Sequence, residues 1–263
     1  MDIEAYYERI GFTDGGSDTD RLYRLHFGHC THIPYENLDV YNGEDVSLDP
    51  EDLYRKMVIR HRGGYCFEMN GMFHAALTAS GFRAYGVLTR LSLDGTPVGP
   101  YAHRMNIVEA DGVKYICDVG FGGDGFALPL RLETDVVQTV RGIDYRVVPG
   151  TDPAMEYTVQ IRRPEGFQDM MGFVNKPARE ADFSLLSFYM NRSPLSNFRK
   201  GIKVNLFTPT GRISMQDMFL TVRNGDDTDR RELRPEEVHQ ALIDNFGLDV
   251  TLNHLPTCQA ETR

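Results

Sequence analysis

The first third of the chain carries apolar residues at helical spacing. Positions 18–27 show one apolar face and begin beside a serine and an aspartate, which both suit a helix N-cap. Positions 49–61 open on Asp-Pro, a pair that suits a first helical turn, and are followed by two glycines that would end the helix. A third helix is predicted from Cys66 to the neighbourhood of Gly81.

Beyond Gly81 the apolar pattern becomes typical of strands. Strands are predicted at positions 84–93, 103–110, 113–119, 136–148 and 155–162. The last third is mixed, with helices predicted at 182–190 and 234–243 and strands at 202–208 and 218–222. Helices, then strands, then a mixed end predict an α+β protein.

Composition narrows the function classes. The 263 residues carry a formal net charge of −10 and suffice for one large domain or two to three small ones. Nucleic-acid binding needs a basic surface, so no nucleic-acid partner is expected, although a local basic pocket for a phosphorylated small molecule remains compatible. No apolar run approaches the roughly 18 residues of a membrane span, and the acidic start MDIEAYYERIGF lacks signal-peptide features. We therefore expect a cytoplasmic protein without a membrane partner.

The cysteines are interpreted as free thiols. They are Cys30, Cys66, Cys117 and Cys258. They are far apart and form no CxxC pair, so neither a disulfide framework nor a structural zinc site is expected. A further set to weigh as metal ligands is His26, His29, Cys30 and His32. No other ligand of matching spacing follows, and a helix end that runs into a loop explains the set, so no metal is expected.

The stretch RGGYCFE at positions 62–68 places a cysteine at the first turn of the third predicted helix. Unpaired N–H groups and the positive dipole end of a helix favour the thiolate, the reactive form of cysteine. The two glycines let the backbone turn sharply and let a substrate approach closely. Cys66 is therefore a candidate nucleophile. The alternative is a cysteine that merely packs at a helix start.

A predicted hairpin supplies a second part of a site. The favoured two-residue turn Asp-Gly at 111–112 joins two strands, and pairing outward from it matches opposite charges and apolar residues. Continued outward, this register places Met105 opposite Asp118 and His103 opposite Gly120. His103 and Asp118 are then diagonal neighbours, within reach of an imidazole–carboxylate hydrogen bond.

A carboxylate that orients an imidazole is the second half of a nucleophile–base–orienter triad. In this interpretation Asp118 fixes the tautomer of His103, and His103 ionises the thiol of Cys66. The alternative is that His103 and Asp118 satisfy each other on an apolar sheet face and do nothing more.

The glycine-rich stretch at positions 120–125 matches GxGxxG after a strand. A dinucleotide site requires this motif to open a helix. Pro129 follows closely and is poor in a helix interior, so a flexible loop beside Asp118 is the better interpretation.

These residues resemble one family, the arylamine N-acetyltransferases. The matching elements are HIPYENL at 32–38, RGGYCFE at 62–68, His103 on its strand, DVGFG at 118–122 and SPLSNF at 193–198. They occur in the family's order over most of the chain. As a set they are specific, although no single piece would be.

The resemblance implies a core similar to papain-like and transglutaminase-like thiol enzymes. It implies an N-terminal helical bundle at 1–83 with the nucleophilic cysteine, a β-barrel at 84–190 with histidine and aspartate, and a C-terminal α/β lid at 191–263. It also implies a two-step reaction, in which Cys66 takes the acetyl group of acetyl-CoA and an arylamine, hydrazine or N-hydroxyarylamine then receives it.

Family positions for the acceptor pocket fall on Tyr35, Phe121 and Phe198, and positions that contact CoA in relatives fall near Gly99 and Tyr189. Aromatic walls suit a flat aryl substrate. Tyr35 departs from the phenylalanine that is usual in the family, so its hydroxyl affects acceptor choice.

Three other hypotheses stay open. One is an amide synthase of natural-product biosynthesis with the same triad and a carrier-bound or intramolecular acyl donor. Another is a thiol hydrolase of the protease or transglutaminase type. The last is a non-catalytic ligand-binding protein, against which the intact Cys66, His103 and Asp118 argue.

Overall fold

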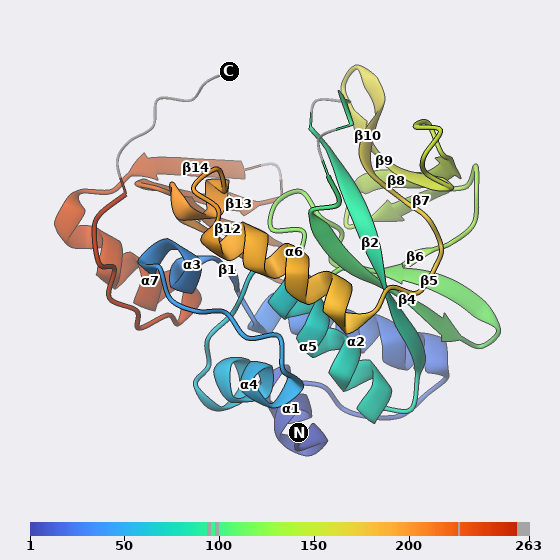
Figure 1. Cartoon of the computed structure of the whole chain (residues 1–263), viewed down its shortest axis with the longest axis horizontal. Coiled ribbons are helices and arrows are strands. Elements are labelled where there is room, and N and C mark those ends of the chain that lie inside the picture. Colours follow the sequence, from blue (N-terminus) through green and yellow to red (C-terminus); the bar gives the residue numbers. More distant parts are fainter. Residues whose placement is uncertain (94–95, 98–99, 226, 257–263) are drawn as a thin grey trace.

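The computed structural model describes residues 1–93, 96–97, 100–225 and 227–256. In Figure 1 a group of helices lies at the bottom, a large antiparallel sheet at the right and a smaller sheet at the upper left. A long helix crosses the middle in front of them. The order along the chain is helices, then strands, then a mixed end, as the sequence predicted.

The helices of the first third are α1 (Ile3–Arg9), α2 (Asp18–His32), α3 (Leu38–Asn42), α4 (Pro50–Tyr54) and α5 (Cys66–Ala79). Helix α2 begins as predicted, with Ser17 as N-cap in a capping box, but it continues five residues past position 27. Its polar residues after Phe27 are therefore helical rather than part of a loop. The segment predicted at 49–61 is helical from Pro50 to Ile59, as the α-helix α4 to Tyr54 and then as a π-helix, Arg55–Ile59.

The large sheet is nearly closed, like a barrel. Its strands are β2 (Arg83–Leu93), β3 (Thr96–Pro97), β4 (His103–Ala110), β5 (Val113–Cys117), β6 (Leu130–Arg131), β7 (Val137–Val140), β8 (Ile143–Pro149), β9 (Tyr157–Arg163) and β10 (Gly166–Phe173). They pair in the order β6-β5-β4-β2-β10-β9-β8-β7, with β3 beside β2. The strand predicted at 136–148 is instead a hairpin, because Arg141 and Gly142 adopt positive φ and form a turn. Strand β10 was not predicted.

The β4–β5 hairpin has the predicted register near its turn. Ile107 pairs with Ile116, and both turn residues, 111 and 112, have positive φ as a type I′ turn requires. The ladder ends at Cys117, so Asp118 does not pair with Met105 as the extended register predicted. The physical reason lies in helix α5, whose side chains bind the backbone beyond Cys117, as described below.

The small sheet joins the two ends of the chain. Its strands are β1 (Tyr35–Glu36), β11 (Lys203–Phe207), β12 (Gly211–Gln216), β13 (Phe219–Asn224) and β14 (Asp227–Glu232). Helix α6 (Glu180–Arg192) and a 3-10 turn (Asn197–Arg199) precede β11 in the chain. A 3-10 turn (Pro235–Glu237) and helix α7 (Val238–Phe246) follow β14. Strand β1 pairs with β11, which fixes the segment after α2 against the last third of the chain. Strands β12 and β14 were not predicted.

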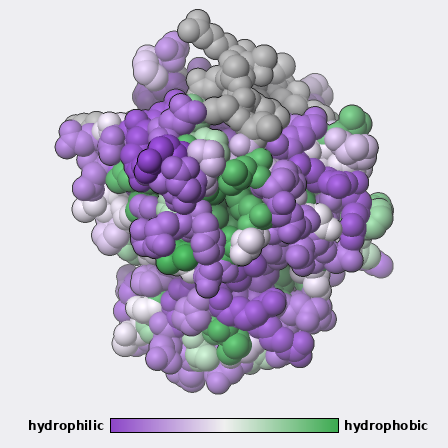
Figure 2. All heavy atoms as spheres, turned by 90° about the vertical axis from the view of Figure 1, so that its left-hand side faces the viewer, coloured by the Kyte–Doolittle hydropathy of each residue, from purple (hydrophilic) through white to green (hydrophobic). Residues whose placement is uncertain are grey.

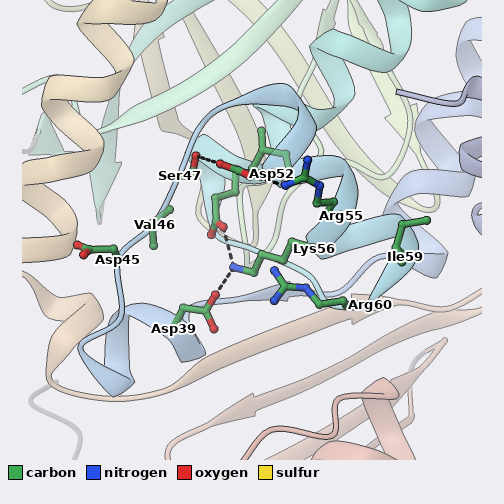
Figure 3. Close-up of a pocket in the computed structure, with 11 residues that line it drawn as sticks. Asp39, Asp45, Val46, Ser47, Asp52, Arg55, Lys56, Ile59 and Arg60 are labelled. Carbon is green, nitrogen blue, oxygen red and sulfur yellow. Dashed lines mark hydrogen bonds and ion pairs between the residues drawn. The ribbon is translucent and has the colours of Figure 1, made fainter.

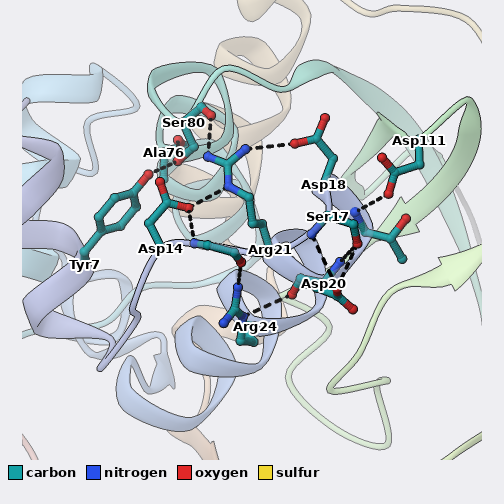
Figure 4. A network of polar contacts seen from close by, with 12 residues as sticks. Tyr7, Asp14, Ser17, Asp18, Asp20, Arg21, Arg24, Ala76, Ser80 and Asp111 are labelled. Atoms are coloured by element: carbon teal, nitrogen blue, oxygen red, sulfur yellow. Dashed lines mark hydrogen bonds and ion pairs between the residues drawn. The ribbon is translucent and has the colours of Figure 1, made fainter.

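A polar network fastens the hairpin to the helices (Figure 4). Arg21 on α2 donates to the carbonyl oxygen of Ser80 at 3.0 Å, and the Tyr7 hydroxyl donates to the Ser80 hydroxyl at 2.8 Å. The backbone N–H of Thr19 donates to the carboxylate of Asp111 in the β4–β5 turn at 2.9 Å. These contacts fix the β4–β5 turn against the start of α2, and they fix α1 and α2 against the end of α5.

The face at the left of Figure 1 is mostly hydrophilic, with apolar side chains in a few separate groups (Figure 2). Within the described ranges, no helix combines the length and apolar character that crossing a membrane requires. The domain boundaries at residues 83 and 190 stay a prediction.

Candidate active site

Cys66 is the first residue of α5, at the edge of the helical group. The Glu68 carboxylate accepts the backbone N–H of Tyr65 at 3.1 Å, which fixes the start of the helix. A Cβ on Gly63 would lie 1.7 Å from the carbonyl oxygen of Pro34, so the chain before the helix requires glycine there. The glycine of this motif thus serves close backbone packing, and the cysteine stays at the positive end of the helix.

A buried ionic network lies under this helix start (Figure 3). Lys56 donates to Glu68 at 2.6 Å and contacts Asp39 at 2.7 Å. Burial raises the pKa of Glu68, Lys56 opposes this, and the pKa is about 7. Arg62 forms an ion pair with Glu36 at 2.8 Å. The network connects the first turn of α5 to α3 and to the π-helix. Its role is therefore to fix the position of α5.

His103 and Asp118 form a direct contact in the interior. The Nε2 atom of His103 lies 2.6 Å from a carboxylate oxygen of Asp118, and both side chains are buried. Burial acts to lower the pKa of His103, but Asp118 outweighs it, and a hydrogen bond with Cys66 adds to the increase, giving a pKa of about 10. The Cys66 sulfur also lies 4.0 Å from the carbonyl oxygen of Ala102. The structure therefore brings the three predicted triad residues together, and the raised pKa favours the protonated form of His103.

Asp118 is held from several directions. Asn70 donates to its carboxylate at 2.9 Å, and so does the backbone N–H of Gly120. Burial acts to raise the pKa of Asp118, but His103 and these donors outweigh it and lower the pKa. The His26 Nε2 atom accepts the backbone N–H of Asp118 at 3.2 Å. The carboxylate is thus ionised and fixed, through both its side chain and its backbone.

Sequence reasoning missed the roles of Asn70 and His26. Asn70 lies four residues after Cys66 on α5, so the helical spacing places it on the same face and was a usable signal. It also accepts the N–H of Val119 at 3.1 Å, which draws the chain after β5 out of the ladder. His26 was weighed only as a metal ligand. The described residues contain no group of three or more histidine, cysteine or acidic side chains placed to hold a metal.

The predicted acceptor residues surround the triad at different depths. The Phe121 ring lies 5.9 Å from the His103 ring at an interplanar angle of 76°. Tyr35 is buried and lines, with Phe121, a cavity of about 10 Å³ beside Asp118. Phe198 does not line that cavity and packs against Tyr65 instead, with ring centroids 5.5 Å apart. The cavity has room for little more than a water molecule, so an aryl ring requires side-chain movement.

Of the two predicted CoA-contacting residues, one can be placed. Tyr189 on α6 is 45% exposed and lines an apolar groove of about 640 Å³ together with Tyr101. Tyr101 precedes Ala102, whose carbonyl contacts the Cys66 sulfur. Gly99 lies outside the described residues, and so does Cys258 among the cysteines.

Comparisons with known proteins agree on one family. Residues 18–255 match the family model described as N-acetyltransferase. The arylamine N-acetyltransferase of Escherichia coli (strain K12) is 33% identical over 254 residues, which cover 94% of this chain and 89% of that protein. The arylamine N-acetyltransferase structure from Salmonella typhimurium has a TM-score of 0.88 at 30% identity, and covers 97% of this chain and 94% of its own.

The Mycobacterium marinum arylamine N-acetyltransferase, solved in complex with CoA, has a TM-score of 0.87 at 29% identity, with 94% of this chain and 93% of that chain covered. Fold and sequence thus define an acetyltransferase. The chain belongs to the arylamine N-acetyltransferase family, which confirms the family predicted from its motifs.

Proposed function

We propose that the chain transfers an acetyl group from acetyl-CoA to the nitrogen of arylamines, arylhydrazines or N-hydroxyarylamines, in two steps through an acetyl-Cys66 thioester. The observation that carries the proposal is the buried 2.6 Å contact between His103 and Asp118 next to the thiol at the start of α5. The chemistry requires a free thiol at Cys66, which favours a reducing compartment such as the cytosol.

In the first step the Cys66 sulfur attacks the carbonyl carbon of the thioester. His103 holds the proton of the thiol, and Asp118 stabilises the imidazolium. The backbone N–H of Cys66, at the helix start, is an oxyanion donor. The bond between the acetyl carbon and the CoA sulfur breaks, and His103 gives its proton to the departing thiolate. Cys66 is left acetylated and His103 neutral.

In the second step the amine nitrogen attacks the acetyl-Cys66 carbonyl. Neutral His103 takes the proton of the amine, and the Cys66 thiolate leaves. This restores the charged imidazole beside the sulfur. Because one histidine donates in the first step and accepts in the second, the enzyme needs no further acid or base.

The acceptor pocket is assigned to Tyr35, Phe121 and Phe198, whose rings suit a flat aryl group. The cavity beside Asp118 is small, so entry of the ring requires lining side chains to move. By the family resemblance, Gly99 and Tyr189 are assigned to contacts with CoA, and Tyr189 lines the apolar groove beside Tyr101. In this proposal the core is papain-like, and residues 191–263 act as the lid.

The direct test is the intact mass of the protein after incubation with acetyl-CoA. The expected result is the gain of one acetyl group that maps to Cys66 and is absent from Cys66→Ser. Cys30→Ala is the matched control, because Cys30 is also a free buried thiol, and it keeps the acetyl group. An unchanged mass of the unmodified chain contradicts the proposal.

Turnover then separates the remaining hypotheses. Acetyl-CoA with simple anilines gives N-acetylanilines if the proposal holds. Acetylated Cys66 without transfer to any aniline indicates an amide synthase with another acceptor. Release of free acid without an amine indicates a thiol hydrolase.

A further inference from the structure

Arginines converge on the glycine-rich loop that follows β5. Asp124 in this loop contacts Arg212 of β12 at 2.8 Å, Arg163 of β9 at 2.7 Å and Arg223 of β13 at 3.5 Å. One carboxylate thus faces three guanidinium groups that come from both sheets. This cluster therefore carries an excess of positive charge, although the formal net charge of the whole chain is −10.

A fourth arginine adds to this surplus. Arg141, in the turn between β7 and β8, donates to the carbonyl oxygen of Thr208 at 2.6 Å and lies over the rings of Phe27 and Phe207. Among the described residues it has no carboxylate partner. Burial lowers the pKa of Arg141 and also that of Arg212, which Asp124 opposes. Partly dehydrated cations without matching anions favour an anionic ligand.

These side chains line a groove of about 670 Å³ between the two sheets. This volume is in the range of small-molecule and cofactor sites. Arg141, Arg212 and Arg223 line it, and Asp124 is the only acidic lining residue in the part of the chain that the structure describes. Four of the lining residues are glycines, which leave the backbone accessible to a bulky anion.

The groove lies next to the candidate active site. Gly125 and Phe207 line both the groove and the small cavity that contains Asp118 and Phe121. A ligand held at the arginines would therefore lie within one layer of side chains of the triad.

We propose that this groove binds a small phosphate compound, whose phosphate oxygens are held by Arg141, Arg212 and Arg223. A phosphate group matches the excess positive charge of the arginines better than a carboxylate does. It carries more negative charge and accepts paired N–H donors from guanidinium groups. Two sources carry this chemistry. One is the nucleotide part of the CoA donor, an assignment that rests on the proposed function, and the other is a free nucleotide or inorganic phosphate.

Calorimetric titration of the whole chain tests the site with four probes: CoA, pantetheine, adenosine 3′,5′-bisphosphate and inorganic pyrophosphate. The test variants are Arg141→Gln and the double variant Arg141→Gln/Arg223→Gln. The control, Arg83→Gln, makes the same charge change at an exposed position on β2. Each lost arginine is expected to raise the Kd of the phosphorylated probes about tenfold, as for hydrogen bonds to charged groups. Pantetheine binding and the control stay unchanged.

The probes separate the two sources. If CoA and the bisphosphate weaken together, the groove holds the donor. If the Kd of the bisphosphate or of pyrophosphate rises in the arginine variants and the Kd of CoA does not, the site holds a free phosphate compound. If no phosphorylated probe changes by more than about twofold in the folded double variant, the proposal is overturned. Circular dichroism melting checks that each variant is folded. If the double variant does not fold, the single variant Arg141→Gln still tests the proposal, because it loses only one hydrogen bond, to the carbonyl oxygen of Thr208.

Failure of the proposed function has a different signature. Acetyl-pantetheine lacks phosphates, so it acetylates Cys66 equally well in the unmodified chain and in the arginine variants if the triad works. Arginine-dependent binding of phosphates without any acetylation of Cys66 keeps the groove and rejects the transferase.

Discussion

The two sides of Asp118 hold buried histidines that behave in opposite ways. On the carboxylate side, contact with Asp118 raises the pKa of His103 to about 10 against the effect of burial. On the backbone side, burial lowers the pKa of His26 to about 4, although Ala127 and Asp118 act to raise it. The rings are equally inaccessible, with exposed fractions of 1% and 0%.

Burial alone therefore favours the neutral form of a histidine, whereas direct contact with the Asp118 carboxylate outweighs burial and favours the cation. Each state suits its position. In the proposed mechanism His103 needs a proton that it can give and take, while His26 needs a free lone pair to accept the backbone N–H of Asp118. Asp118 therefore contacts one histidine that is proposed to act in the chemistry and another that fixes its backbone.

The largest expected effect comes from removing the charge between the two rings. Asp118→Asn keeps the shape, but it lowers the pKa of His103 toward the neutral form that burial favours. By analogy with orienting carboxylates in other triads, we expect kcat/KM for acetyl-CoA and an arylamine to fall about 10³- to 10⁴-fold. Steady-state kinetics at neutral pH measure the change.

The matched control is Asp111→Asn, which removes a carboxylate from the exposed β4–β5 turn. Its activity should stay within a few-fold of the unmodified chain. Nearly normal turnover in Asp118→Asn would mean that the carboxylate does not set the state of His103.

A smaller effect is expected on the backbone side. His26→Leu removes the acceptor for the Asp118 N–H, and we expect kcat/KM to fall about 10- to 100-fold because the carboxylate is displaced. His26→Gln places an amide oxygen near the Nε2 position and should recover most of the activity. If the leucine and glutamine variants are equally active, the ring does not position Asp118.

A third effect is expected on stability against acid. The folded-state pKa of His26, about 4, lies below the ordinary 6.5, so the unfolded chain binds an extra proton between these values. The stabilisation present above pH 6.5 is lost as the pH falls toward 4, and a shift of this size corresponds to about 3 kcal/mol. Burial lowers the pKa of His29 in the same direction.

Urea unfolding at pH 7 and at pH 4.5 measures this effect. His26→Gln should lose less stability than the unmodified chain over this interval, since glutamine does not titrate. His32→Gln is the control, because that side chain lies at the end of α2 and is exposed. The same loss in all three proteins would mean that His26 is not held neutral.

Much of the fold was predictable because its signals are local. The apolar spacing predicted α2 and α5, and the Asp-Gly turn predicted the register of β4 and β5. The helix start at Cys66 and the hairpin register of His103 and Asp118 predicted the candidate triad, and His103 and Asp118 are in direct contact in the structure. Strands β12 and β14 were missed because polar and charged residues dominate them, and their places are fixed by pairing within the small sheet.

The rest of the site depends on contacts between distant segments. His26 and Asp118 are 92 residues apart, and no local pattern predicts that a helix residue accepts that backbone N–H. The arginine groove likewise draws on both sheets, and its charge excess opposes that of the whole chain. Sequence motifs therefore predict the candidate reacting groups, while the supporting contacts depend on how distant segments fold together.

The measurement that most directly tests the contrast between the two rings is an NMR titration of ¹⁵N-labelled histidine side chains. His103→Gln and His26→Gln assign the two rings among the eight histidines. We predict that between pH 5.5 and 8.5 the His103 ring stays doubly protonated while the His26 ring stays neutral. A His103 ring that loses its proton near pH 6.5, as an ordinary imidazole does, would contradict the mechanism.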